Sequence, residues 1–152
     1  MRPAFILASL IVFAASAQAE PLSVNKGQWA VSQDIYYEAS ASGEKIDIPS
    51  EHASVEECWS QDEEVLIDES MVDMFEGCVS TGATPMAYGL DIGLSCNFDG
   101  LEVNGSALFS LSHDRDSFVA QVNLASPPED AVDFRSHMLM IGHRSGTCAA
   151  PG

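Results

Sequence analysis

Hydrophobic and polar residues alternate along most of this chain with a period of two. The alternation is clearest over residues 29–38, 90–98, 101–111, 118–124 and 134–143. In an extended strand, successive side chains point to opposite faces, so this pattern is typical of strands that bury one face. The pattern therefore predicts a protein built mainly from half-buried β-strands.

The segments between these strands carry turn signals. Residues 39–50 contain Ser-Ala-Ser-Gly and Pro49, which predict a loop that breaks before the proline. Asp99-Gly100 and residues 113–116 predict turns between neighbouring strands. Asn104-Gly105 is also a hairpin sequence, and the pattern alone leaves open whether it forms a turn.

One segment has the features of a helix. Ser60-Gln61-Asp62-Glu63 forms a capping box, in which the serine hydroxyl and the glutamate carboxylate each satisfy a free amide at a helix start. Val65, Met71, Val72 and Phe75 then form an apolar stripe. Together they predict an α-helix over residues 61–75, ended by Gly77.

These elements follow one another without the alternation of strands and helices that marks a parallel sheet. Consecutive strands separated by short turns favour antiparallel pairing. We therefore expect an α+β fold: a curved antiparallel β-meander with one α-helix packed on it.

The first 19 residues have the organisation of a targeting segment. Arg2 is followed by an apolar stretch over residues 5–15 and by Ala17-Gln18-Ala19, the small-x-small pattern of a signal-peptidase site. The apolar stretch is shorter than the ~20 residues that cross a bilayer as a helix. We expect a cleaved signal peptide at residues 1–19, a single domain at residues 20–152, and a periplasmic or secreted location without membrane insertion.

The four cysteines all lie in the predicted mature domain, at positions 58, 78, 96 and 148. An even number of cysteines in an exported protein favours disulfides. Zinc is the alternative, but no pair has C-x-x-C spacing. Two disulfides are therefore expected, and spacing alone allows three connectivities.

Several motifs occur in an order that resembles a known family. Gly27-Gln28-Trp29 opens the first strand, Cys58 and Cys78 flank the predicted helix, and the chain closes with Gly142-His143-Arg144-Ser145-Gly146-Thr147-Cys148. This order, from Gly27 to Cys148, resembles the Domain of Unknown Function 3617 family of exported proteobacterial proteins. Trp59-Ser60 replaces the Thr-Pro pair that is common in that family after the first cysteine. The resemblance implies export and disulfides, and it implies no catalytic residues.

The meander favours one disulfide connectivity. If residues 79–86 and 89–97 form a hairpin centred near Ala87, Cys78 and Cys96 face each other at a distance suited to a disulfide. Cys58 would then pair with Cys148. The alternative, Cys58 with Cys78, requires the chain to fold back at Gly77.

The charge balance excludes some partners. Asp and Glu number 23 against 6 Lys and Arg, for a net charge of −17, and 46% of the residues are hydrophobic. Nucleic acid and anionic membranes repel such a chain, whereas its apolar content is too high for a disordered acidic tail. The acidic runs near the predicted helix favour solubility over catalysis.

The polar and sulfur-containing residues suggest two kinds of chemistry, hydrolysis and metal binding. A hydrolase would use His113 or His137 with nearby acids, but no G-x-S-x-G motif is present. A metal site would use residues 113–116, with Asp114 and Asp116 as oxygen ligands, or Met138 and Met140 as soft ligands. The period of two places Met138 and Met140 on one face and the flanking histidines on the other, which favours a core role for both methionines.

The aromatic residues suggest a binding surface. Trp29, Tyr37, Phe109 and Phe118 are expected to line the concave face of the sheet, where a curved sheet can hold an apolar ligand. We therefore expect a monomeric, non-enzymatic binding or structural domain that requires no cofactor. Its partner would be a hydrophobic small molecule or another envelope protein, and a metal-binding protein or a small hydrolase is the alternative.

Overall fold

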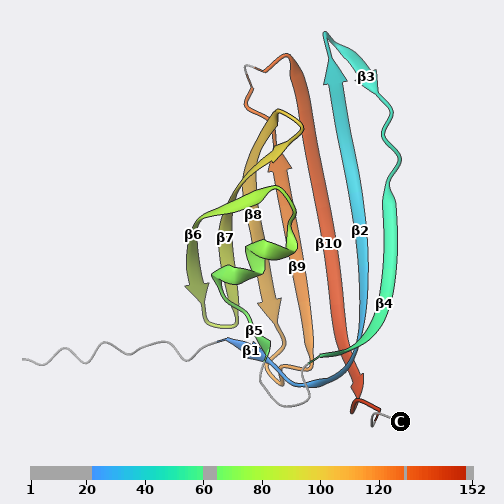
Figure 1. Cartoon of the computed structure of the whole chain (residues 1–152), viewed down its shortest axis with the longest axis vertical. Coiled ribbons are helices and arrows are strands. Elements are labelled where there is room, and N and C mark those ends of the chain that lie inside the picture. The colour runs from blue at the N-terminus through green and yellow to red at the C-terminus, as the bar shows by residue number, and fades with distance from the viewer. Residues whose placement is uncertain (1–21, 60–64, 129, 150–152) are drawn as a thin grey trace, which may run out of the picture.

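The computed structural model describes residues 22–59, 65–128 and 130–149. The predicted signal peptide and the capping box at residues 60–63 lie outside this range. The described chain consists of ten strands and one 3₁₀-helix (Figure 1). They are β1 (Ser23–Val24), β2 (Gly27–Ala41), β3 (Glu44–Ile46), β4 (Glu51–Trp59), β5 (Val65–Leu66), η1 (Glu69–Met74), β6 (Cys78–Met86), β7 (Gly89–Phe98), β8 (Leu101–Leu111), β9 (Ser117–Ala125) and β10 (Val132–Gly146).

An open antiparallel sheet of eight strands dominates the structure. Its order is β3-β2-β10-β9-β8-β7-β6, and β4 pairs with β2 beside β3. Strands β6 to β10 follow one another as a meander, which confirms the antiparallel arrangement expected from the sequence. The long strand β10 lies between β9 and β2, so the last strand joins the first long strand to the meander.

The turn at Asp99-Gly100 forms as predicted, with both residues at positive φ (52° and 94°), the conformation of a two-residue hairpin turn. Asn104-Gly105, in contrast, lies inside β8. A Cβ atom on Gly105 would lie 1.7 Å from the carbonyl oxygen of Asn123 on β9. This glycine therefore allows two strands to approach closely instead of forming a turn.

The predicted loop at residues 39–50 is partly wrong. Strand β2 continues to Ala41, and a turn at Ser42-Gly43 leads into β3. Residues 39–41 pair with β10 on one side and β3 on the other. Backbone pairing on both sides keeps this small-residue stretch extended despite its loop-like composition.

The predicted α-helix at residues 61–75 is wrong over its described part. Residues 65–66 form strand β5 with β1, and the Ile67 amide donates to the Leu22 carbonyl at 2.7 Å. Only residues 69–74 are helical, as a 3₁₀-helix capped by Asp68, whose side chain accepts from the Ser70 amide. Pairing with the N-terminal strand therefore overrides the local helix preference, and the α+β label is met only loosely.

Both expected disulfides are present. Cys78 and Cys96 face each other across the β6–β7 hairpin with Cα atoms 3.9 Å apart, and Cys58 is joined to Cys148 at 5.4 Å. The pairing derived from the hairpin is confirmed. Two disulfides indicate that the protein folds in an oxidising, extracytoplasmic compartment.

Candidate functional site: an apolar groove on the inner face of the sheet

The two faces of the sheet differ in character. We call the face that carries Trp29, Phe109 and Met138 the inner face, and these three side chains are buried in one core cluster. Met71, Val72 and Phe75 from η1 and its end pack against this cluster. In Figure 1, η1 overlies the β7–β9 part of the sheet, whereas β2, β10 and β4 stand clear of it. The helix therefore overlies only the β7–β9 part of the inner face.

A groove opens beside the helix on this face. Its volume is about 490 Å³, within the range of about 300–1,000 Å³ that is typical of small-molecule sites. It runs from the end of η1 across the sheet to β2. Its floor contains Val122 and Leu124 from β9 and Met138 and Met140 from β10.

The lining is mainly apolar and combines aromatic, methionine and aliphatic side chains. Phe75 and Met74 form the helix side of the groove, and Met74 keeps 49% of its surface exposed. Tyr37 and Phe134 approach each other at the β2 side, with ring centroids 6.2 Å apart. Methionine adapts its shape to irregular apolar partners, so this lining suits a hydrophobic ligand.

A polar contact marks the β2 side of the groove. The Tyr37 hydroxyl lies 3.2 Å from Glu51 Oε1, on strand β4. Burial raises the pKa of Tyr37 above its usual value, and the Glu51 carboxylate adds to the rise. Tyr37 is therefore a neutral hydrogen-bond donor there at physiological pH.

The four predicted lining residues separate into two groups. Tyr37 lines the groove, whereas Trp29, Phe109 and Phe118 are not among its lining residues and are 0%, 1% and 6% exposed. The Trp29 ring stacks on Trp59 at 5.0 Å and lies 5.8 Å from Phe118. These buried rings thus fill the core instead of lining the groove.

Sequence reasoning missed several lining residues. Gln33 and Ile35 are two and four residues before Tyr37 on the same strand, so the alternation predicts that they share a sheet face with Tyr37, although they were not named as lining residues. Glu51, which contacts Tyr37 but does not itself line the groove, had no such signal, because strand β4 was not predicted. That strand is an edge strand whose side chains, except for Trp59, are exposed, and it lacks the alternation of a half-buried strand.

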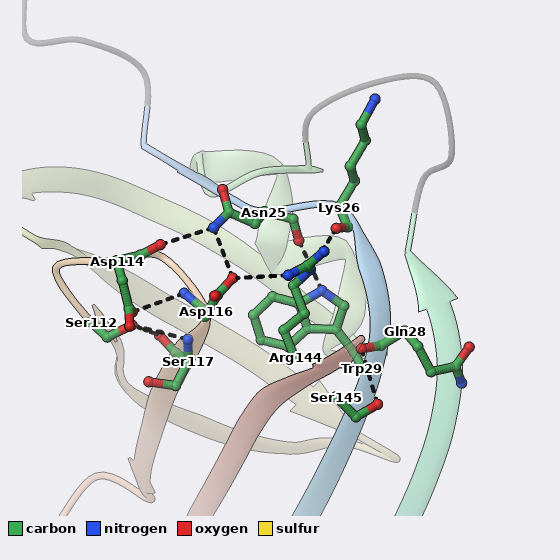
Figure 2. Close-up of polar contacts among 10 residues, drawn as sticks. All are labelled: Asn25, Lys26, Gln28, Trp29, Ser112, Asp114, Asp116, Ser117, Arg144 and Ser145. Atoms are coloured by element: carbon green, nitrogen blue, oxygen red, sulfur yellow. Dashed lines mark hydrogen bonds and ion pairs between the residues drawn. The ribbon is translucent and has the colours of Figure 1, made fainter. Parts of the chain in front are cut away.

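A polar network closes the end of the sheet near Trp29 (Figure 2). The Asn25 side chain donates to the Asp114 carbonyl at 2.9 Å and to Asp116 Oδ1 at 2.8 Å. Arg144 Nε donates to the Lys26 carbonyl at 2.7 Å, and the Trp29 indole donates to the Asn25 carbonyl at 2.9 Å. The network joins the β1–β2 connection to the β8–β9 turn and to β10.

The turn at residues 113–116, a candidate metal site in the sequence, has its carboxylates engaged in contacts within the protein. Asp114 Oδ1 accepts from the Ser112 hydroxyl at 2.5 Å and from the Asp116 amide at 3.1 Å. In the described part of the chain, no three His, Cys, Asp or Glu side chains gather to hold a metal ion. Met138 and Met140 are buried in the core and form part of the groove floor.

We expect the Ser112→Ala substitution to raise the pKa of Asp114. The Ser112 hydrogen bond is the largest cause that lowers this pKa, and the Asp116 amide adds to it. Because the folded-state pKa is lowered, the contact stabilises the turn above the unfolded value of about 3.9 and is lost as the pH falls through the folded value. A carboxyl-carbon NMR titration measures the change, with Ser110→Ala as the control. An unchanged Asp114 titration in Ser112→Ala would contradict this assignment.

The histidines considered for hydrolysis are not brought together with a nucleophile by any contact described for them. His137 Nδ1 lies 2.7 Å from Asn123 Oδ1, and the His113 ring packs edge-on against Tyr88 at 5.6 Å. His52 Nδ1 lies 2.7 Å from Asp34 Oδ1 on the exposed β2–β4 edge, a pair that the sequence did not single out. A pair of this kind orients an imidazole, but it needs a nucleophile and a pocket for catalysis.

A second cavity, of about 670 Å³, lies near the β6–β7 turn. Its lining includes five ionisable side chains, those of Asp68, Glu69, Tyr88, His113 and Arg115, beside apolar ones. Arg115 already donates to the Ser23 hydroxyl at 3.1 Å. The groove is the better candidate for an apolar ligand, because Tyr37 and Glu76 are its only ionisable lining side chains among the described residues.

Among the residues that the structure describes, no helix has the length and apolar character needed to cross a membrane. No family model matches the chain, and no curated protein or solved structure is significantly similar to it. The resemblance to the Domain of Unknown Function 3617 family therefore stays a prediction from the sequence motifs.

Proposed function

We propose that this protein is an exported, monomeric, non-enzymatic binding domain that holds a hydrophobic small molecule in the groove on its inner face. In this proposal the signal peptide at residues 1–19 directs the chain to the periplasm, where the domain acts without a cofactor. An envelope protein that docks on the same face is the alternative partner.

One observation carries the proposal: a cavity of about 490 Å³ whose floor and walls are mainly methionine, aromatic and aliphatic side chains. Burying apolar ligand area there gains about 25 cal/mol per Å² before the costs of association. The open apolar surface is therefore a source of binding free energy.

A groove-filling substitution tests the proposal. Ser136 lines the groove on β10, so Ser136→Trp fills the space without removing a core side chain. We expect a neutral apolar fluorophore, N-phenyl-1-naphthylamine, to bind the natural protein and to bind Ser136→Trp at least about tenfold more weakly, a loss of about 1.4 kcal/mol. Titration of the fluorescence measures both affinities.

Ile141→Trp is the matched control. Ile141 is exposed on the opposite face of the same strand, so this change adds the same side chain away from the groove. Its affinity for the dye should stay within about twofold of the natural protein. If the dye fails to bind, or binds Ser136→Trp and the natural protein equally, the groove is not a ligand site.

A further inference from the structure

The charged side chains described at the groove are all acidic. The described lining of the groove contains no lysine, arginine or histidine, and its one carboxylate is Glu76, beside the end of η1. A second carboxylate, Glu51, lies at the other side, held by the Tyr37 hydroxyl. Glu51 pairs with Ile35, itself a lining residue, so it stands at the rim and not on a distant surface.

The basic side chains near this end of the groove project elsewhere. Arg135 is flanked on β10 by Phe134 and Ser136, which line the groove, so it points to the opposite face. It lies 3.6 Å from Asp133. Lys45 pairs with Ser40, one residue beyond the inner-facing Ala39, and is also on the opposite face. Among the described residues, the ligand therefore meets carboxylates without a compensating cation.

Tyr37, Phe134 and Glu51 have the composition of an ammonium site. Two tilted aromatic rings with centroids 6.2 Å apart present π-faces and edges, and a carboxylate lies beside one of them. Aromatic faces attract ammonium groups, which is how quaternary amines are commonly recognised. An anionic head would instead lose its hydration next to a like charge.

We infer that the ligand of the groove is a cationic amphiphile, an apolar body that carries an amine or quaternary ammonium head. The head lies against Tyr37, Phe134 and Glu51, and the apolar body extends over Met138 and Met140 toward Phe75. This inference rests on the proposed function, because it assigns the chemistry of the ligand to the same groove.

Three ligands with one alkyl chain and different heads test the inference: dodecyltrimethylammonium, dodecyl maltoside and dodecanoate, each below its micelle concentration. Displacement of the neutral fluorophore gives their affinities at about 0.15 M salt, where distant charges are largely screened. We expect the cation to bind about tenfold more tightly than the neutral ligand and about 100-fold more tightly than the anion.

The Glu51→Gln substitution distinguishes binding at the head site from general attraction of a cation to the negatively charged protein. This substitution should weaken the binding of the cation about fivefold to tenfold and leave the affinity for the neutral ligand unchanged. Glu102→Gln is the matched control, because it removes the same charge from an exposed position on β8 that lies on the opposite face. Thermal melts of both variants report whether the fold is retained.

The outcomes distinguish the two claims. If the fluorophore does not bind, the proposed function fails and the head site fails with it. If the fluorophore binds but the three ligands bind with equal affinity, the groove is a ligand site without a cationic head site. The same conclusion follows if Glu102→Gln weakens the binding of the cation as much as Glu51→Gln does. A selective loss in Glu51→Gln supports the assignment.

Discussion

Replacing Cys58 and Cys148 together by serine is expected to lower the free energy of unfolding by about 4–5 kcal/mol. This disulfide joins residues 90 positions apart and ties the end of β4 to the segment after β10. In the chain-entropy model, a cross-link over so long a loop removes more freedom from the unfolded chain than a short one does. Urea unfolding of the oxidised natural protein and the double variant measures the difference.

The second disulfide provides the comparison. Cys78 and Cys96 are 18 positions apart, so the Cys78→Ser, Cys96→Ser variant should lose about 3 kcal/mol. Its two strands also remain paired along the β6–β7 hairpin. A larger loss for this pair than for Cys58 and Cys148 would show that strand geometry, and not loop length, sets the contribution of each disulfide.

The Trp29→Ala substitution should cost about 3–5 kcal/mol, the range for removing a large buried aromatic side chain. Trp29 is fully buried, stacks on Trp59 and contacts Phe118. Its removal leaves a cavity beside Trp59 and Phe118, which stack on each other, and takes the indole donor from the Asn25 carbonyl. Because the two remaining rings are fixed to different strands, β4 and β9, we expect the cavity to collapse only partly.

Tyr36→Ala is the control for this substitution. Tyr36 is on the same strand, points to the other face and is 53% exposed, so its loss should change stability by less than about 0.5 kcal/mol. Denaturant midpoints at unchanged m-value give both numbers. A Trp29→Ala loss below about 1 kcal/mol would mean that Trp59 and Phe118 close the gap without it.

Strand positions were predictable because alternation is a local property. Successive side chains of β7 and β9 point to opposite faces of the sheet, and the buried positions are those that the alternation predicts. The Asp99-Gly100 turn and the Cys78–Cys96 pair follow from the same local register. The inward position of Met138 and Met140 was likewise predictable.

The helix was not predictable in the same way. The apolar stripe at Met71, Val72 and Phe75 does pack against the core. The Ile67 amide, however, donates a hydrogen bond to the carbonyl of Leu22, 45 residues earlier in the chain. A contact between segments so far apart leaves no periodic trace in either one. The described part of this segment is therefore strand and 3₁₀-helix where local signals favour an α-helix.

The candidate site shows the same division. Alternation along a strand assigns each side chain to a face, so the sequence alone predicts which residues share the inner face, Tyr37, Met138 and Met140 among them. Which part of that face stays open depends instead on how the strands and η1 assemble. Trp29 and Phe118 are covered because Trp59, at the end of β4, stacks on both rings. Tyr37 borders a groove because the groove separates β2 from the end of η1. That outcome depends on pairings such as β2 with β10, which bring together residues more than 90 positions apart and whose free energy depends on the whole assembled sheet.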